Sequence, residues 1–255
     1  MKNLLTLVFT FISLCLFAQS ENRQKKIDTV DVTYSIYKLF SDIRLQQEIS
    51  ELKIEFDTIT KSEFEIYREK YGQKIDTISN TTTSRKNCFS IRIADTIFKF
   101  PSIMGRSHYY GGFYPKLKCH LVKVAGEGIC EMFLIDQKTG TGLALPAFYD
   151  GSCNQPMISN DNQFLMTYGT CSEGNGCFNY YEHISMISII NLKDTNSITE
   201  LTNFRVIGIN DFAIKDIFWI DNNFIVLKVF DEIAFDEKGH DYLKNIRYIK
   251  GKIKW

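Results

Sequence analysis

From Cys88 onward, short apolar stretches alternate with polar turns along the chain. Residues 88–93 alternate apolar and polar positions, and the apolar stretch Leu117–Val124 ends at a Gly126-Glu127-Gly128 turn. Alternation with a period of two, bounded by turn residues, predicts strands. Further strands are predicted over residues 97–100, 132–135, 143–145, 164–168, 184–190, 217–220, 224–230 and 245–253. Short strands at these intervals predict a mainly β fold: a sandwich, barrel or propeller.

The preceding segment has helical periodicity. Apolar residues recur at helical spacing from Ile36 to Ile43, and helix-favouring residues continue to Glu48. A polar connector over residues 77–83 follows this segment. We therefore expect three parts: a signal peptide over 1–20, a helix-containing N-terminal segment over 21–85, and an antiparallel β domain over 86–255.

A second helix is predicted near the end of the N-terminal segment. Thr60 or Ser62 supplies a capping side chain, and Gly72 ends the helical pattern. Three aromatic residues between them are spaced to lie on one helical face: Phe64, Tyr67 and Tyr71.

Two strand-and-turn segments repeat weakly within the β domain. In each copy an apolar strand ends in a turn, and an Asp-Asn turn then starts a second apolar strand. The strand ends are Leu134-Ile135-Asp136 and Ile189-Ile190-Asn191, and the Asp-Asn turns are Asp161-Asn162 and Asp221-Asn222. The copies lie about 55 to 60 residues apart, near the ~50-residue period of kelch propellers. A repeat of this length predicts blade-like units.

One of these turns resembles a known family. Residues 155–165 are similar to the Pro-x-x-Ser-x-Asp-Gly-x-x-Leu turn of TolB-like β-propeller blades, with Asn160 in place of Pro and Asn162 in place of Gly. The resemblance implies blades over residues 131–235, and the stretch from Tyr109 to Leu145 is similar to exported bacterial proteins with such blades. It implies no activity. A closed propeller usually has at least four blades and the chain from Cys88 holds about three, so we expect a propeller-like or strongly curved antiparallel sheet closed by the N-terminal part.

The first twenty residues predict export. Lys2 precedes the apolar stretch Leu4–Phe17, and Ala18-Gln19-Ser20 places small residues at a cleavage site. The apolar stretch is short for an uncleaved anchor, which needs ~20 residues. A lipoprotein attached through Cys15 is disfavoured because bulky Leu14 precedes it. We expect a periplasmic or secreted protein with no transmembrane segment after cleavage.

The cysteine content agrees with an oxidising compartment. Cys15 leaves with the signal peptide, and six cysteines remain: Cys88, Cys119, Cys130, Cys153, Cys171 and Cys177. An even number in an exported chain predicts disulfides, with 15 pairings open and buried free thiols as the alternative. Only Cys171–Cys177 is predicted locally, because a short loop with two glycines joins these residues. Zinc is disfavoured because no CxxC pair occurs.

Charge and motifs narrow the possible chemistry. Lys plus Arg and Asp plus Glu both number 30, which gives no electrostatic signature for nucleic acid. The chain has no nucleophile elbow, phosphate loop, dinucleotide fingerprint or HExxH motif. His120 is expected on the surface. The acidic stretch Asp231–Asp241 offers oxygen ligands for Ca²⁺, but we favour a solvated hairpin tip and expect no metal or cofactor.

Aromatic residues are the best candidates for a binding surface. The chain has 20 Phe and 13 Tyr, and two glycine-rich aromatic loops are predicted over 107–114 and 171–181. The binding residues predicted there are Tyr109, Tyr110, Tyr114, Tyr180 and Tyr181. We expect an exported, non-enzymatic binding or interaction protein of the bacterial cell envelope, with a protein, peptide or glycan partner. The alternative is an envelope hydrolase with dispersed carboxylates, which would require a facing carboxylate pair.

Overall fold

Strands dominate the part of the chain that the structure describes. This computed structural model describes residues 28–31, 48–72, 82–85, 88–93, 96–101, 107–126, 129–148, 153–171, 183–192, 198, 201 and 203–255. The predicted signal peptide, most of the first predicted helix, Cys177, Tyr180 and Tyr181 lie outside these residues. No helix in the described ranges is long and apolar enough to cross a membrane.

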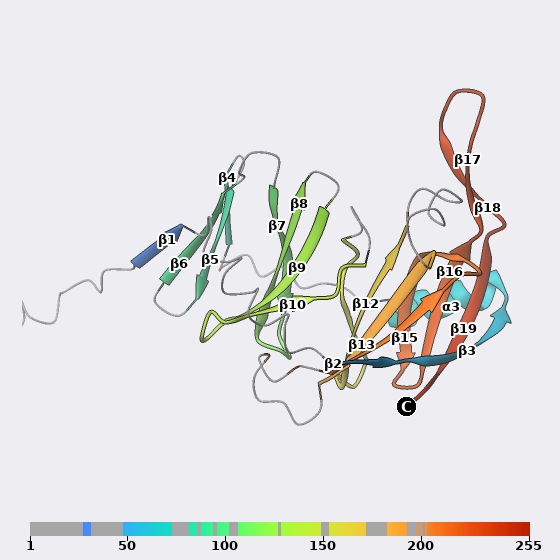
Figure 1. Cartoon of the computed structure of the whole chain (residues 1–255), viewed down its shortest axis with the longest axis horizontal. Helices are drawn as coiled ribbons and strands as arrows, with labels where there is room; N and C mark the ends of the chain where they lie inside the picture. The colour runs from blue at the N-terminus through green and yellow to red at the C-terminus, as the bar shows by residue number, and fades with distance from the viewer. Residues whose placement is uncertain are drawn as a thin grey trace, which may run out of the picture.

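Four sheets follow one another along the chain, each built around an antiparallel meander, which in the fourth sheet is interrupted by a hairpin (Figure 1). The first has the order β1 (Asp28–Asp31), β6 (Thr96–Pro101), β5 (Cys88–Ile93), β4 (Thr82–Arg85). The second has the order β10 (Gly142–Leu145), β9 (Ile129–Asp136), β8 (Cys119–Gly126), β7 (Ser107–Tyr114). The third has the order β11 (Met157–Ile158), β12 (Phe164–Thr170), β13 (Ser185–Asn191), β14 (Asn203–Ile209), β2 (Glu48–Glu51). The fourth has the order β15 (Ala213–Asp221), β16 (Phe224–Phe230), β19 (Arg247–Lys254), β3 (Lys53–Ile59), and β17 (Glu232–Phe235) pairs with β18 (Asp241–Lys244) in a separate ribbon.

Strands from the N-terminal segment complete three of the sheets. Strand β1 pairs in parallel with β6, β2 pairs in parallel with β14, and β3 pairs antiparallel with β19. Glu48 begins strand β2, so the prediction that it continues a helix was wrong. Its backbone pairs with Asn203, a long-range contact that overrides the local helix preference.

The second and third sheets are buried on both faces because each lies between two other sheets. In β9, Met132 and Leu134 belong to the core shared with the third sheet, whereas Phe133 and Ile135 belong to the core shared with the first. Successive side chains of a strand point to opposite faces, so one apolar run supplies two cores. A third core joins the third and fourth sheets around Trp219.

Helix α3 (Lys61–Tyr71) covers the outer face of the fourth sheet. Thr60 is its N-cap in a capping box with Glu63, and Gly72 follows its last turn, as the sequence predicted. Phe64 is completely buried, and its ring centroid lies 5.4 Å from that of Phe218. The aromatic face of the helix therefore seals this end of the stack.

The mainly β prediction is confirmed, as are the positions of its predicted strands and of the second helix. The two repeated segments occupy similar places: Leu134 and Ile189 lie in the third strands of the second and third sheets. Asp161 lies between the first and second strands of the third sheet, and Asp221 is the last residue of the first strand of the fourth. Among the described residues, no hydrophobic cluster joins the first sheet to the fourth. Closure into a propeller therefore stays a prediction.

The glycine-rich stretch 107–114 was predicted as a loop, and this was wrong: it is strand β7. The register shifts between Tyr110 and Gly112, and Gly112 has φ 112°. A Cβ on Gly111 would lie 2.5 Å from Leu121 Cδ2. The glycines thus provide a β-bulge and a close approach to β8, which the sequence pattern did not distinguish from a loop.

The predicted surface position of His120 was also wrong, because its side chain is completely buried. Its Nδ1 lies 3.1 Å from the Tyr110 hydroxyl, and its Nε2 has no hydrogen-bond partner among the described residues. Burial lowers the pKa of His120 to about 4. The rings of Phe113 and Tyr110 lie 4.9 and 6.0 Å from the His120 ring, and the first sheet packs on this face of the second. A polar residue here therefore does not mark the surface.

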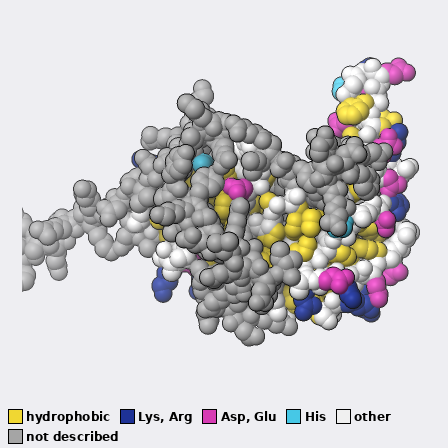
Figure 2. All heavy atoms as spheres, in the orientation of Figure 1, with side chains coloured by type: hydrophobic (Ala, Val, Ile, Leu, Met, Phe, Trp, Pro, Cys, Tyr) yellow, Lys and Arg dark blue, Asp and Glu magenta, His cyan; other side chains and the backbone are white. Residues whose placement is uncertain are grey.

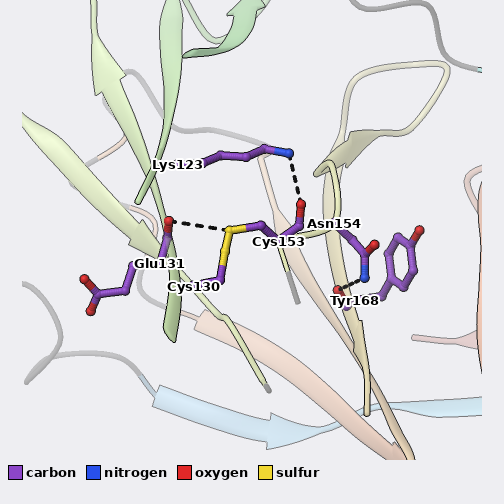
Figure 3. The surroundings of a disulfide bond; sticks show 6 residues. All are labelled: Lys123, Cys130, Glu131, Cys153, Asn154 and Tyr168. Atoms are coloured by element: carbon purple, nitrogen blue, oxygen red, sulfur yellow. Dashed lines mark hydrogen bonds between the residues drawn. A yellow bond between two sulfur atoms is a disulfide. The ribbon is translucent and has the colours of Figure 1, made fainter. Parts of the chain in front are cut away.

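One disulfide ties the second sheet to the third (Figure 3). Cys130 in β9 bonds Cys153, which precedes β11, with 5.6 Å between the Cα atoms. Lys123 Nζ donates to the carbonyl of Cys153 at 3.0 Å, and Asn154 Nδ2 donates to the carbonyl of Tyr168 at 3.3 Å (Figure 3). The disulfide and these hydrogen bonds therefore attach the segment that connects the two sheets to both of them.

Two further cysteines differ in their bonding. Cys119 is a buried free thiol, and burial raises its pKa. Cys171 is disulfide-bonded. Because its predicted partner Cys177 lies outside the described residues, the Cys171–Cys177 pairing stays a prediction.

Candidate functional site

A pocket of about 680 Å³ lies where helix α3 ends beside the first strands of three sheets. The C-terminal end of α3, the end of β7, the β11 turn and strand β15 all contribute to it. Its lining residues are Lys70, Tyr71, Gly72, Phe113, Tyr114, Pro115, Lys116, Met157, Ile158, Ser159, Asn160, Asn162, Phe218 and Trp219. This volume is typical of small-molecule sites, which range from ~300 to 1,000 Å³.

The floor of the pocket is aromatic and buried. Phe113, Tyr114, Phe218 and Trp219 are all less than a tenth exposed. The indole Nε1 of Trp219 donates to the carbonyl of Met157 at 3.4 Å. Because these rings are held by the sheets on which they lie, they form a rigid apolar surface rather than a mobile one.

The Tyr114 hydroxyl fixes the floor to the segment before β11. It donates to the carbonyl of Pro156 at 2.7 Å and accepts from Gln155 Nε2 at 2.6 Å. Gln155 Nε2 also donates to the carbonyl of Gly111 at 3.0 Å. Burial raises the pKa of Tyr114, so this phenol stays neutral at physiological pH. Its role in the pocket is therefore to position the floor.

A polar turn forms one wall. Ser159 Oγ donates to Asp161 Oδ1 at 2.7 Å and accepts from the backbone N–H of Phe164 at 3.0 Å. Asn162 takes a left-handed conformation with φ 62°. TolB-like blade turns have glycine at the corresponding position. The wall is therefore a closed turn whose shape is set by its own hydrogen bonds.

This turn also contacts its repeat in the fourth sheet. Asn222 Nδ2 donates to Asp161 Oδ2, and Asn160 Nδ2 donates to the carbonyl of Ile220 at 3.0 Å. Burial alone would raise the pKa of Asp161, but hydrogen bonds from Ser159, Gln163 and Asn222 outweigh it and lower the pKa. The carboxylate is therefore ionised and occupied in joining the two sheets.

The rim of the pocket is positively charged. Lys70 and Lys116 both line it and are exposed, and the described lining residues include no carboxylate. Neither ammonium group makes an ion pair with a described residue. A hydrogen bond with the Tyr71 side chain raises the pKa of Lys70, whose Nζ lies 4.9 Å from the Tyr71 ring centroid. The rim therefore has two positive charges without an acidic partner among the described residues, above an apolar floor.

The predicted binding tyrosines do not form one group. Tyr114 lines the pocket. Tyr109 is 54% exposed on β7 but does not line it, and Tyr110 packs against Phe89 at 6.0 Å between centroids. Tyr180 and Tyr181 lie outside the described residues.

Sequence reasoning missed most of the pocket. Lys70, Lys116, Phe218 and Trp219 come from three distant segments, and none belongs to a motif. The Asp161 turn was noticed in the sequence as a repeated turn, and it forms one wall, but no binding role was predicted for it. The other lining residues come together at the pocket only because the sheets stack.

The acidic stretch 231–241 is a hairpin that projects from the fourth sheet (Figure 1), with acidic side chains at its tip (Figure 2). Asp236 Oδ1 accepts from the backbone N–H groups of Lys238 and His240 at 2.8 and 2.9 Å. The hydrogen bond from the His240 backbone is the main reason for the lowered pKa of Asp236. The hairpin interpretation is confirmed, and the described residues hold no cluster of three or more metal-ligating side chains.

The buried polar side chains of the described residues include no carboxylate. They are His120, Ser159, Thr167, Ser185 and Ser188. Comparison with known proteins finds no match to this chain among family models, curated proteins or solved structures.

Proposed function

We propose that this chain is an exported protein of the bacterial cell envelope that acts by binding a ligand in the pocket beside helix α3, without catalytic turnover. The observation that supports binding is the pocket itself: a rigid aromatic floor with unpaired charges on its rim. A preorganised apolar surface with a few polar groups around it is the usual composition of a ligand site.

Export is supported by two independent features. The N-terminal sequence has the order of a signal peptide, with Lys2, an apolar stretch and small residues at Ala18 to Ser20. The Cys130–Cys153 disulfide fits an oxidising compartment, where such bonds persist. Intact-mass analysis of cell fractions tests this part. We expect a mature chain beginning between Gln19 and Glu21 in the envelope, and a full-length chain in the cytoplasm would contradict it.

Binding is tested with a thermal-shift screen of small molecules, short peptides and oligosaccharides. We expect ligands that raise the melting temperature of the wild-type protein but not of the Lys116→Trp variant, because a bulky indole at the rim occupies the mouth of the pocket. Lys138→Trp is the matched control, since Lys138 is also an exposed lysine in a turn and does not line the pocket.

The outcome separates binding from other activities. Ligands that stabilise the wild type and both variants equally would place the site elsewhere. Each stabilising compound is then incubated with the protein and analysed by mass spectrometry. Recovery of the unchanged compound is expected. Turnover that disappears on replacing one carboxylate or histidine would overturn the non-enzymatic proposal.

A further inference from the structure

We infer that the pocket beside helix α3 recognises an amphipathic carboxylate, in which one anionic group is attached to an aromatic or aliphatic body. This inference rests on the proposed binding function and names the class of ligand. It combines two features of the same pocket: the apolar floor that would hold the body, and the lysine pair that would hold the charge.

The charge of the pocket is a local feature rather than a consequence of the whole chain. Lys plus Arg equals Asp plus Glu over the sequence, so the net charge is zero. The pocket nevertheless has Lys70 and Lys116 at its rim and no carboxylate among its described lining residues. Both side chains are cationic, so an anionic group that enters the pocket is attracted to them.

The two lysines come from different elements. Lys70 lies in the last turn of α3, and Lys116 lies in the turn after β7. The exposed ion pairs of α3 use other residues, since Arg68 pairs with Glu65 and Asp216. Lys70 thus remains available to a ligand even though its own helix and the adjacent strand carry acidic groups.

The apolar floor determines the rest of the ligand. Phe113, Phe218 and Trp219 present buried ring surface, while the polar atoms of Trp219 and Tyr114 are already bonded within the protein. A sugar ring or a bare phosphate would find few free hydrogen-bonding groups on this surface. An apolar body gains by leaving water, at about 25 cal/mol for each Å² of apolar area buried.

Because both basic residues are lysines, they would hold the anionic group by point charges. An ammonium group is a compact charge without the planar fork that grips phosphate or carboxylate in two places. The charge contribution therefore depends on salt, because exposed pairs are screened at a Debye length of ~8 Å in physiological buffer. The same chemistry occurs in a free small acid and at the C-terminus of a peptide that ends in an apolar residue.

The experiment compares matched probes in ligand-observed NMR titrations of the purified protein. The small-acid probe is 3-phenylpropionate, and its neutral control is 3-phenylpropionamide, which has nearly the same shape. The peptide probe is Gly-Gly-Gly-Phe with a free C-terminus, and its control is the C-terminally amidated peptide. We expect each free acid to bind about tenfold more tightly than its amide, a difference of about 1.4 kcal/mol.

Protein variants test the site. Lys70→Gln combined with Lys116→Gln should remove the tenfold preference for the acid over the amide. Lys61→Gln is the control, because Lys61 is exposed on the same helix and does not line the pocket. The Lys61→Gln variant should keep the preference for the acid. Raising the salt concentration should weaken this preference in the wild type.

The outcomes distinguish this inference from the binding proposal. Equal binding of acid and amide, lost in Lys116→Trp, would overturn the carboxylate inference and leave the pocket as a binding site. A preference for the acid that persists in the double lysine variant would overturn the inference by placing the anion elsewhere. Binding of one acid probe but not the other identifies the source as a small molecule or a peptide end. Absence of binding by all four probes would overturn the inference, while the unbiased thermal-shift screen still tests the binding proposal.

Discussion

Removal of one hydroxyl from the floor of the pocket should destabilise the whole protein. Tyr114 is 2% exposed, and its hydroxyl bonds both Pro156 and Gln155. In a Tyr114→Phe variant the ring remains, so little apolar contact is lost. The carbonyl of Pro156 loses its donor, whereas Gln155 keeps its second acceptor on Gly111. A buried group left without its partner costs about 1–3 kcal/mol.

Urea denaturation followed by circular dichroism measures this cost, and a thermal melt gives a second measurement. A loss of ~2 kcal/mol corresponds to a fall in the melting temperature of about 4–8 °C for a chain of this size. Tyr109→Phe is the control, because Tyr109 is 54% exposed on the same strand and its change should stay within about 0.5 kcal/mol. If the two variants have the same stability, the Tyr114 hydroxyl does not join β7 to the β11 segment as described.

Three further predictions concern stability. Replacing Cys130 and Cys153 together by Ser should cost about 3.4 kcal/mol by the loop-entropy relation, since 23 positions separate them, and urea midpoints with peptide mapping check this. Phe64→Ala should cost ~3–5 kcal/mol because its ring is completely buried against the fourth sheet, whereas Ile66→Ala, at an exposed position of the same helix, should cost far less in the same melts. The pKa of His120 is lowered to about 4, so the unfolded state binds the proton first as the pH falls from 6.5 to 4. Stability should therefore decrease across that window, by up to about 3 kcal/mol at 1.36 kcal/mol per pKa unit, and a flat profile in pH-dependent denaturation would contradict it.

The sequence predicted elements whose signals are local. Helix α3 was placed correctly because Thr60, Phe64 and Gly72 give its cap, its buried face and its end. The strands of the central meanders were found because their apolar runs are bounded by turn residues, as at Asp136 and Asp221. Period, cap and turn are properties of a few neighbouring residues, so they need no knowledge of the fold.

Features that depend on distant contacts were missed or misplaced. Strand β3 alternates Ile54 and Phe56 with charged residues, but only its pairing with β19 makes it the edge of the fourth sheet. Figure 2 shows mixed charges along this part of the surface, which suits an edge strand that must not pair with other chains. His120 gave no local sign that two sheets would bury it. Contacts between residues that are distant in the sequence determine both the edge position of β3 and the burial of His120.

The candidate site was only partly accessible to sequence reasoning. Tyr114 was selected for its aromatic, glycine-rich surroundings, and it does line the pocket. The same reasoning selected Tyr109 and Tyr110, which lie on β7 but do not line the pocket. This stretch was predicted as a loop, so the alternation of side chains between the two faces of a strand was not considered. Lys70 and Trp219 carried no motif, since their meaning comes from the fold that places them together.

The central claim, that the protein binds a ligand in this pocket, is tested most directly at Trp219. The chain has two tryptophans, so a ¹H–¹⁵N spectrum contains two indole signals, and a Trp255→Phe variant assigns them. Trp219 lines the pocket, whereas Trp255 stacks on Phe164 with 4.1 Å between centroids. We predict that a ligand which raises the melting temperature shifts the Trp219 indole signal in a saturable way and leaves the Trp255 signal in place. A stabilising ligand that saturates the protein without moving the Trp219 signal would contradict the account.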